Sequence, residues 1–201
     1  MTECGQIGSH AAAFPEPELY RLQPGELVLA ASEGDIPSIQ TEDSYFVQVE
    51  KADLEDTDLV VGLLIGVSRA YPVRLLSLHE VVNDRVGDRA IAVTWCPLCY
   101  STVVFDRIVD GEELSFRASG YLLHDNLVLI DHPTDTLWSQ LLGQGIKGAR
   151  RGSIWSRPLS QPGEFGVRVI RIPGFCQLRI WDMMEISQIH MRDTLVAEPQ
   201  D

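Results

Sequence analysis

The sequence predicts a mainly β (α+β) fold: a single antiparallel β-sheet domain, barrel-like or sandwich-like, with a few short peripheral helices. Three observations lead to this prediction. Short runs rich in β-branched and aromatic residues recur along the chain, and Pro and Gly separate them. The connections are mostly shorter than the crossovers of about a dozen residues that join parallel strands. A chain of 201 residues is also long enough to form one domain with its own core.

The chain divides into three parts by composition. Residues 1–25 are rich in Pro, Ala and Glu without apolar periodicity, so we expect a loosely ordered N-terminal segment. Residues 26–194 carry the β-type runs and are expected to form the single β-rich domain. Residues 195–201 are expected to form a polar tail.

The first half of the domain predicts strands around one helix. Residues 26–40 predict a strand and then a loop, because a short apolar run precedes Gly-Asp and Ile-Pro turn signals. Residues 58–76 predict a hairpin, with Pro72 excluded from a central strand position because it has no N–H to donate. Ser77 then predicts a helix over residues 78–86, which Gly87 would end, because Glu80 completes a capping box.

The second half predicts more strands. Residues 90–95, 101–109 and 112–119 read as a meander, with the cysteines in its first connection and an Asp110-Gly111 hairpin turn in its second. Residues 126–131 predict another strand, and residues 136–142 a short helix. Residues 166–172 and 176–180 predict strands around the Pro173-Gly174 turn, followed by a helix over 181–191.

Charge and hydropathy exclude several classes of partner. The formal net charge is -13, from 16 basic and 29 acidic residues, so nucleic acid and anionic lipid are not expected partners. No apolar run approaches the roughly 20 residues of a membrane span, and the first residues do not resemble a signal peptide. We therefore expect a cytoplasmic protein that acts on a small-molecule substrate, with its oligomeric state left open.

The sharpest chemical feature is the pair Cys96 and Cys99, separated by Pro97-Leu98 at the end of an apolar run. Two thiols at this spacing can close a disulfide or present both sulfurs to one soft metal ion. They can also be reduced, half-buried small residues without chemistry. Cys4 and Cys176 have no partner nearby in the sequence. The spacing alone leaves all three interpretations open.

Polar residues elsewhere could complete a site around the thiols. His124 is the best spare imidazole, and His79, Glu80 and Asp131 are further acid, base or orienting candidates. The His79-Glu80 pair does not predict a zinc protease, because Asn83 stands where the second imidazole would be needed. The candidate substrate-binding residues are Ser119, Asn126, Trp138, Ser139 and Gln140.

The favoured function is a small-molecule enzyme of unknown reaction, centred on the Cys-x-x-Cys pair. Zinc or copper would be bound by Cys96, Cys99 and His124 or His79, with a position open for substrate. The first alternative is a dithiol/disulfide redox protein in which Cys96 is the exposed nucleophile and Cys99 the resolving thiol. The second is a metal-independent ligand-binding β-barrel or biosynthetic cyclase, in which the thiols have no role.

Across roughly residues 35–160 the chain resembles the bacterial family catalogued as domain of unknown function 3179. The segments that carry the resemblance are GDIPSI, VSRAYPVRLLSLHEVVND, AVTWCPLCYSTVVFDR, Ser119-Gly120, NLVLID and LWSQLLGQGIKG. It implies that these residues occupy the family's motif positions: Arg69, Tyr71, Pro72, His79, Glu80, Asn83, Asp84, Cys96, Pro97, Cys99, Ser119, Asp131, Trp138, Ser139 and Gln140. The resemblance supplies no reaction. The chain departs from the pattern where Trp95 replaces a tyrosine, Tyr100 a glycine and His124 an asparagine.

Overall fold

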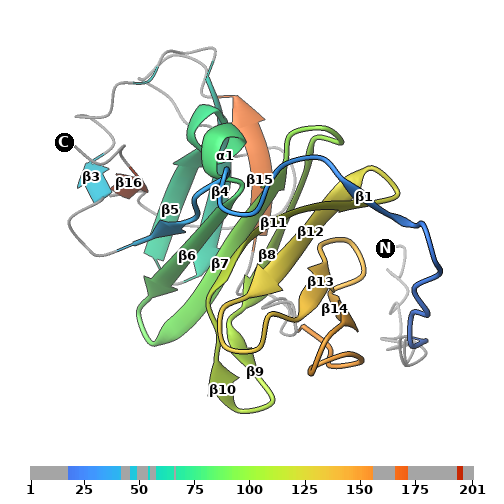
Figure 1. The fold of residues 1–201 in the computed structure, drawn as a ribbon. Helices are drawn as coiled ribbons and strands as arrows, with labels where there is room; N and C mark the ends of the chain where they lie inside the picture. The colour runs from blue at the N-terminus through green and yellow to red at the C-terminus, as the bar shows by residue number, and fades with distance from the viewer. Residues whose placement is uncertain are drawn as a thin grey trace, which may run out of the picture.

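The computed structural model describes residues 18–41, 46–48, 54, 58–65, 67–155, 166–171 and 194–196. Within these residues the chain is mainly β, as predicted, with one short helix and three larger sheets (Figure 1). None of the three sheets closes into a barrel in this part of the chain, so the architecture is layered. The predicted strand over 176–180 and helix over 181–191 lie outside the described residues.

The middle sheet has the strand order β2-β6-β7-β8. It consists of β2 (Ile39–Gln40), β6 (Val81–Val86), β7 (Arg89–Cys96) and β8 (Ser101–Asp106). β6, β7 and β8 form an antiparallel meander, of which only β7 and β8 belong to the predicted one, whereas β2 pairs with β6 in parallel. Every residue of β7 after Arg89 is buried. This explains the continuous apolar run before the cysteines, because the sheet is covered on both faces.

A second sheet, here called the β4 sheet, covers one face of the middle sheet. Its order is β15-β4-β5-β16-β3, from β15 (Gly166–Arg171), β4 (Leu59–Ile65), β5 (Val67–Pro72), β16 (Thr194–Val196) and β3 (Phe46–Gln48). β4 and β5 form the predicted hairpin, with Pro72 at the end of β5. β16 pairs with β5 in parallel, so the fold is not purely antiparallel. Leu195 and Val196, predicted to begin the polar tail, lie in β16.

A third sheet, here called the β12 sheet, covers the other face. Its order is β1-β11-β12-β13-β14, from β1 (Leu27–Leu29), β11 (Phe116–Leu123), β12 (Asn126–Asp131), β13 (Leu137–Ser139) and β14 (Gln144–Lys147). β9 (Ile108–Val109) and β10 (Glu112–Glu113) form a separate hairpin around the predicted Asp110-Gly111 turn. The predicted run over 112–119 therefore begins in β10 and ends in β11, which belongs to a different sheet from β8.

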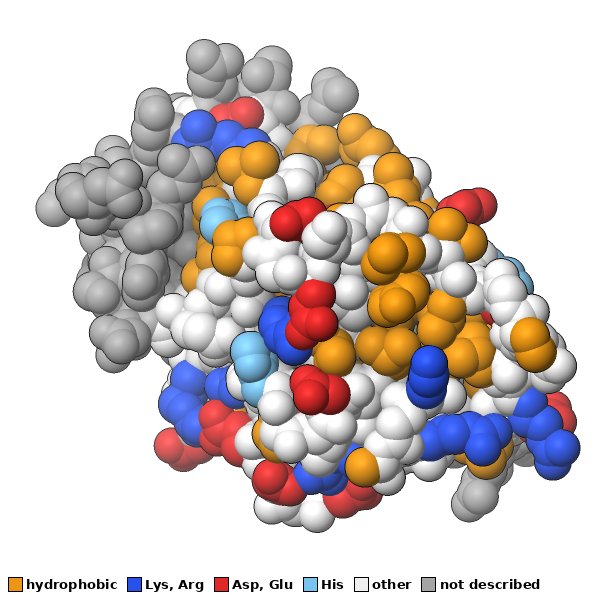
Figure 2. Space-filling model, viewed as in Figure 1, with side chains coloured by type: hydrophobic (Ala, Val, Ile, Leu, Met, Phe, Trp, Pro, Cys, Tyr) orange, Lys and Arg blue, Asp and Glu red, His pale blue; other side chains and the backbone are white. Residues whose placement is uncertain are grey.

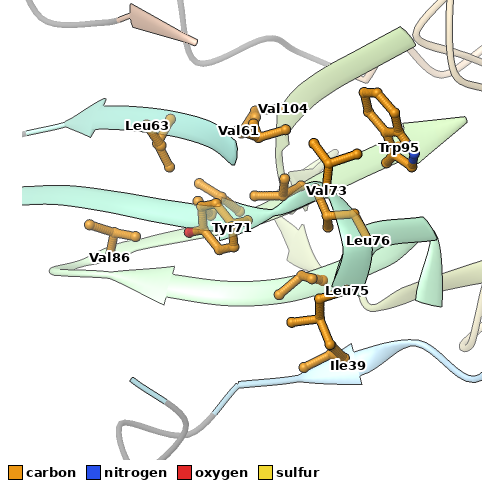
Figure 3. Close-up of a cluster of buried hydrophobic side chains, with 13 residues drawn as sticks. Ile39, Val61, Leu63, Tyr71, Val73, Leu75, Leu76, Val86, Trp95 and Val104 are labelled. Carbon is orange, nitrogen blue, oxygen red and sulfur yellow. The ribbon is translucent and has the colours of Figure 1, made fainter. Parts of the chain in front are cut away.

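Successive side chains of β7 point alternately into two hydrophobic cores. Ile91, Val93 and Trp95 pack with the β4 sheet, whereas Ala92 and Cys96 pack with the β12 sheet. Figure 3 shows side chains from α1 (Val73–His79), β4 and β5 meeting Trp95 and Val104 of the middle sheet. Each fully buried Leu or Val contributes about 1.5 to 3 kcal/mol. The pleat of β7 therefore directs Cys96 towards the β12 sheet.

The helix predicted over residues 78–86 is wrong. α1 spans Val73–His79, and Glu80 ends it in a left-handed conformation with φ 57° while its N–H donates to Leu76 O over 2.7 Å. Residues 81–86 form β6, because its side chains alternate between the two cores and β-branched Val residues suit a buried strand. Ser77 is inside α1, and its Oγ accepts from Trp95 Nε1 over 3.1 Å instead of capping a helix.

The helix predicted over residues 136–142 is also wrong. Residues 137–139 form β13, which pairs with β12 on one side and β14 on the other. All three side chains of β13 are buried, and Trp138 lies among Phe116 and Trp155. Packing of this aromatic group favours the extended conformation over the helix that the short apolar pattern indicated.

Candidate functional site

The two thiols lie where β7 ends and β8 begins. Cys96 is the last residue of β7 and pairs with Ser101, the first residue of β8, while residues 97–100 form the turn between them. Pro97 suits the start of this turn because it cannot donate to a strand ladder. The β11–β12 turn lies beside it, since Cys96 Sγ approaches the carbonyl oxygen of Asp125 to 3.9 Å. The site is therefore built from two neighbouring turns.

The two cysteines are free thiols in unequal surroundings. Cys96 is buried, with 1% of its surface exposed, whereas Cys99 is exposed. Burial raises the pKa of Cys96, and its hydrogen bond to Cys99 raises it further. The prediction that Cys96 would be the exposed nucleophile is wrong. The pleat that directs Cys96 into the core leaves Cys99, three residues later in the turn, as the accessible sulfur.

Hydrogen-bond donors surround the sulfur of Cys99. Ser101 Oγ lies 3.0 Å from Cys99 Sγ, and Asn126 Nδ2 donates to it over 3.1 Å. Desolvation raises the pKa of Cys99, but hydrogen bonds from Cys96, Ser101 and Asn126 outweigh it, so that its pKa is lowered. Cys99 is therefore the sulfur that these neighbours stabilise as a thiolate.

Gln140 holds the donors of Cys99 in place. Its side chain is fully buried, and its Oε1 accepts from Ser101 Oγ and from Asn126 Nδ2, each over 2.8 Å. Its Nε2 donates to Thr94 Oγ1 over 3.0 Å, and Thr94 in turn donates to the Val103 carbonyl. This connected group ties β7, β8, β12 and the end of β13 together around the thiol.

The hydroxyl of Ser101 can donate its single hydrogen to either of two acceptors. Its hydroxyl has one hydrogen but two acceptors within reach, Gln140 Oε1 and Cys99 Sγ. While Cys99 is a thiol, its S–H can donate to Ser101, which donates to Gln140. Once Cys99 is a thiolate, the Ser101 hydroxyl can turn towards the sulfur, while Asn126 still donates to Gln140. Loss of the Cys99 proton is thus matched by a hydroxyl rotation.

The sequence identified part of this group. Cys99, Asn126 and Gln140, which were all predicted, are joined by hydrogen bonds, and the predicted Cys96 lies at the start of the same turn. Ser101 and Thr94 were missed, because their segment was interpreted only as β-branched strand. The signal that could have found them is the placement of hydroxyl residues two positions before Cys96 and two after Cys99.

Neither predicted imidazole contacts the thiols in the described part of the chain. The side chain of His124 is 67% exposed, and its Nε2 lies 3.2 Å from Tyr20 Oη and 3.6 Å from Glu26 Oε1. His79 Nδ1 lies 2.7 Å from the carbonyl oxygen of Pro37. Among the described residues, no group of three His, Cys, Asp or Glu side chains could hold a metal ion.

The predicted carboxylates also lie outside the thiol group. Asp131 is fully buried at the opposite end of β12 from Asn126, where it accepts from Thr134 and from Trp138 Nε1 over 2.8 Å. It shapes the turn after β12. Glu80 follows α1, and its carbonyl accepts from the Trp95 N–H. Desolvation raises the pKa of the Glu80 carboxyl to about 7.

The remaining predicted substrate-binding residues make contacts within the protein. Ser119 Oγ donates to the Val128 carbonyl over 2.6 Å and is buried between strands. Trp138 packs in the aromatic group with Phe116 and Trp155. Ser139 Oγ accepts from the Leu142 N–H over 3.4 Å. These contacts stabilise the β12 sheet and its turns.

Two residues in the turns beside the thiols have an unusual backbone conformation. Tyr100 has φ 51° and His124 has φ 49°, both in the left-handed region. Glycine and asparagine adopt this region most readily and histidine tolerates it, whereas a tyrosine is strained there. The two turns beside the thiols thus keep a left-handed conformation while carrying larger side chains.

No helix in the described ranges is long and apolar enough to cross a membrane.

Comparison with known proteins identifies the family. Neither the curated proteins nor the solved structures contain a match to this chain. One family model matches residues 33–157, which include both thiols and the side chains around them. Because this match covers more than half of the sequence, the chain belongs to the family described as protein of unknown function (DUF3179).

Proposed function

We propose that this protein is a thiol–disulfide redox protein in which Cys99 is the nucleophile and Cys96 the resolving thiol. The observation that carries the proposal is the inequality of the two sulfurs. Cys99 is exposed and has a lowered pKa, whereas Cys96 is buried and has a raised pKa, and its thiol donates to the Asp125 carbonyl. An accessible thiolate with a neighbouring thiol is the arrangement that disulfide exchange requires.

The proposed reaction has two steps. The Cys99 thiolate attacks one sulfur of a substrate disulfide, so that a mixed disulfide forms and the other substrate sulfur leaves as a thiolate that takes up a proton. Cys96 then loses its proton and attacks Cys99 Sγ, which forms the Cys96–Cys99 disulfide and releases the second substrate thiol. The substrate disulfide is reduced and the protein dithiol oxidised; an external dithiol reverses the change in the protein.

The side chains around Cys99 have defined roles in this scheme. Ser101 and Asn126 stabilise the attacking thiolate, and also stabilise Cys99 as the leaving thiolate when the protein disulfide is reduced. Gln140 keeps both donors in position from the buried side. In many redox proteins a helix N-terminus stabilises the reactive thiolate, whereas here side-chain amide and hydroxyl donors take that role.

A second candidate uses the same sulfurs. Thiolate character at Cys99, with a second sulfur in hydrogen-bonding contact, also suits a soft ion such as zinc or copper. Further ligands would come from a substrate or from water. In this candidate the protein is the metal-dependent small-molecule enzyme that the sequence favoured. Cys96 and Cys99 would then be metal ligands instead of redox groups.

Single-cysteine trapping tests the proposal. Cys96→Ser and Cys99→Ser variants are made in a chain that also carries Cys4→Ser and Cys176→Ser, and each is incubated with a peptide disulfide. Cys96→Ser should accumulate a mixed disulfide visible by mass spectrometry, because the resolving thiol is missing, whereas Cys99→Ser should accumulate little. Equal trapping by both variants, or by neither, would contradict the assigned roles.

Elemental analysis and thiol counting distinguish the second candidate. Protein purified without a histidine tag should contain less than stoichiometric metal, and a mild oxidant should remove two thiols that a dithiol reductant restores. Near-stoichiometric zinc or copper, with two thiols exposed only after chelation, would favour the metal site instead.

A further inference from the structure

The two residues that flank Cys99 in the sequence carry apolar side chains that are exposed to solvent. Leu98 and Tyr100, its two sequence neighbours, are 68% and 74% exposed. These are the two most exposed large hydrophobic residues in the described part of the chain. Exposed apolar side chains that gather at one place commonly mark a binding surface, and Tyr is frequent among residues that dominate interfaces.

The backbone of Tyr100 points to the same conclusion. Its φ of 51° places an aromatic residue in the left-handed region, at a cost of about 1 to 2 kcal/mol. Its ring touches the edge of Trp95, with centroids 5.5 Å apart, but most of its surface remains in solvent. Folding stability therefore does not explain a bulky residue here, whereas contact with a bound partner would.

Two more exposed apolar residues directly follow a member of the thiol network in the sequence. Leu141 and Leu142 directly follow Gln140, whose side chain contacts Ser101, and they are 51% and 46% exposed. Figure 2 shows apolar side chains gathered on the side of the molecule where β1 and β12 lie. Within its turn, the exposed Cys99 therefore stands between two exposed apolar neighbours, Leu98 and Tyr100.

Charge narrows the kind of partner. With 29 acidic and 16 basic residues, the protein repels anionic molecules at neutral pH. This disfavours small acidic disulfides of the glutathione type, which carry several carboxylates. A polypeptide whose cysteine is flanked by apolar, neutral or basic residues would instead bury Leu98 and Tyr100 as it approaches Cys99.

We propose that the substrate of Cys99 is a cysteine of another polypeptide, recognised through apolar residues beside it that pack on Leu98 and Tyr100. This inference rests on the proposed redox function. It assigns the two exposed side chains to recognition and leaves the chemistry to the network of Ser101, Asn126 and Gln140. The bonds formed and broken are those of the exchange described above.

The test compares two mixed disulfides of 5-thio-2-nitrobenzoate, whose release is followed by absorbance. One is a neutral peptide containing Phe-Cys-Leu, and the other is glutathione. The protein carries Cys4→Ser and Cys176→Ser so that only the described thiols react. We expect the apolar peptide to react about tenfold faster than glutathione, with rates compared at two salt concentrations to separate apolar contact from charge repulsion.

Variants locate the contact. Leu98→Ser and Tyr100→Gly should each lower the rate with the apolar peptide by about threefold or more and leave the rate with iodoacetamide unchanged. Glycine suits φ 51°, so Tyr100→Gly removes the ring without adding strain. Leu78→Ser is the matched control, because Leu78 is 63% exposed on α1.

The outcomes separate the two proposals. If both mixed disulfides react at equal rates at high salt, or if Leu78→Ser lowers the rate as much as Leu98→Ser, the recognition surface is overturned while the redox proposal stands. If neither mixed disulfide releases its thiolate although iodoacetamide modifies Cys99, the redox proposal fails and the recognition of a polypeptide cysteine fails with it.

Discussion

At the scale of single residues, the position of one sulfur relative to the pleat of β7 decides its chemistry. Cys96 belongs to the strand and is directed into the core with Ala92, whereas Cys99 belongs to the turn. Their unlike surroundings shift the two pKa values in opposite directions. A paired motif that is symmetric in sequence is therefore asymmetric in reactivity.

The lowered pKa of Cys99 gives the first residue-scale prediction. The rate of Cys99 alkylation by iodoacetamide should rise with pH through a midpoint below that of an unperturbed thiol. Asn126→Ala or Ser101→Ala should each raise this midpoint, because each removes a donor that stabilises the thiolate.

Ser153→Ala serves as the control for this measurement. It also removes a hydroxyl, but one that donates to Asp110 outside the thiol network. The profile of this variant should match that of the unmodified protein. A midpoint that stays the same in Asn126→Ala and Ser101→Ala would show that these side chains do not stabilise the thiolate.

Glu80 gives a pH-dependent prediction for stability. Desolvation raises its folded pKa to about 7 from an ordinary value of 4.5. Between these values the folded state binds more protons than the unfolded state, so this group lowers stability as pH rises through the window. Glu80→Gln should match the original protein near pH 5 and be more stable at pH 8, as measured by urea unfolding.

A second substitution separates charge from backbone at the same position. Glu80 has φ 57°, which glycine adopts without strain, so Glu80→Gly should gain about 1 kcal/mol across the whole pH range in addition to the charge effect. A gap between Glu80→Gln and the original protein that does not widen from pH 5 to pH 8 would rule out the buried carboxyl as its cause.

At the scale of elements, the sequence predicts what is local and misses what depends on the layers. β12 and the β4–β5 hairpin are predicted closely, because their boundaries are marked by turn residues. Residues 81–86 were predicted as a helix, since the capping signal at Ser77 is local. Burial of β6 on both faces, which makes it a strand, depends on two sheets that are distant in sequence.

The candidate site shows the same division. Cys96 and Cys99 were found from their spacing, and Asn126 and Gln140 from their polar surroundings. The imidazole of His124 was assigned to the thiols because polar residues flank it near a strand start, but the turn directs it towards Tyr20 and Glu26. The direction of a side chain at φ 49° cannot be read from neighbouring residue types.

Asn83 in β6 provides the prediction at this scale. Its amide donates to the Phe116 carbonyl over 2.7 Å and accepts from the Phe116 N–H over 2.8 Å, which joins the middle sheet to the β12 sheet. Asn83→Ala leaves both buried backbone groups unpaired and should cost about 2 to 5 kcal/mol in urea unfolding. Arg85→Gln, in the same strand but 51% exposed at its side chain, should cost less than about 1 kcal/mol. Similar losses in the two variants would contradict this role of Asn83.

At the scale of the whole molecule, repulsion among the surplus acidic side chains opposes the stabilisation that a few ion pairs provide. Arg69 pairs with Asp84 over 2.5 Å in a buried position that also receives the Tyr71 hydroxyl. Other pairs are exposed on at least one side, such as Arg117 with Glu33 and Arg89 with Asp106. Salt screens exposed charges strongly and buried pairs weakly. The response of stability to salt therefore reports mainly on the surplus of surface acid.

The last prediction follows from this balance. At pH 8, raising NaCl from 20 to 300 mM should increase the melting temperature by about 2 to 4 °C, because screening weakens the mutual repulsion behind the net charge of -13. The same salt step near the sequence pI of 4.7 should produce no increase, since the net charge is then close to zero. Calorimetry at both pH values measures the two responses. A melting temperature that falls with salt at pH 8 would contradict this prediction. It would mean that the exposed ion pairs stabilise the protein more than repulsion among the surplus acidic residues destabilises it.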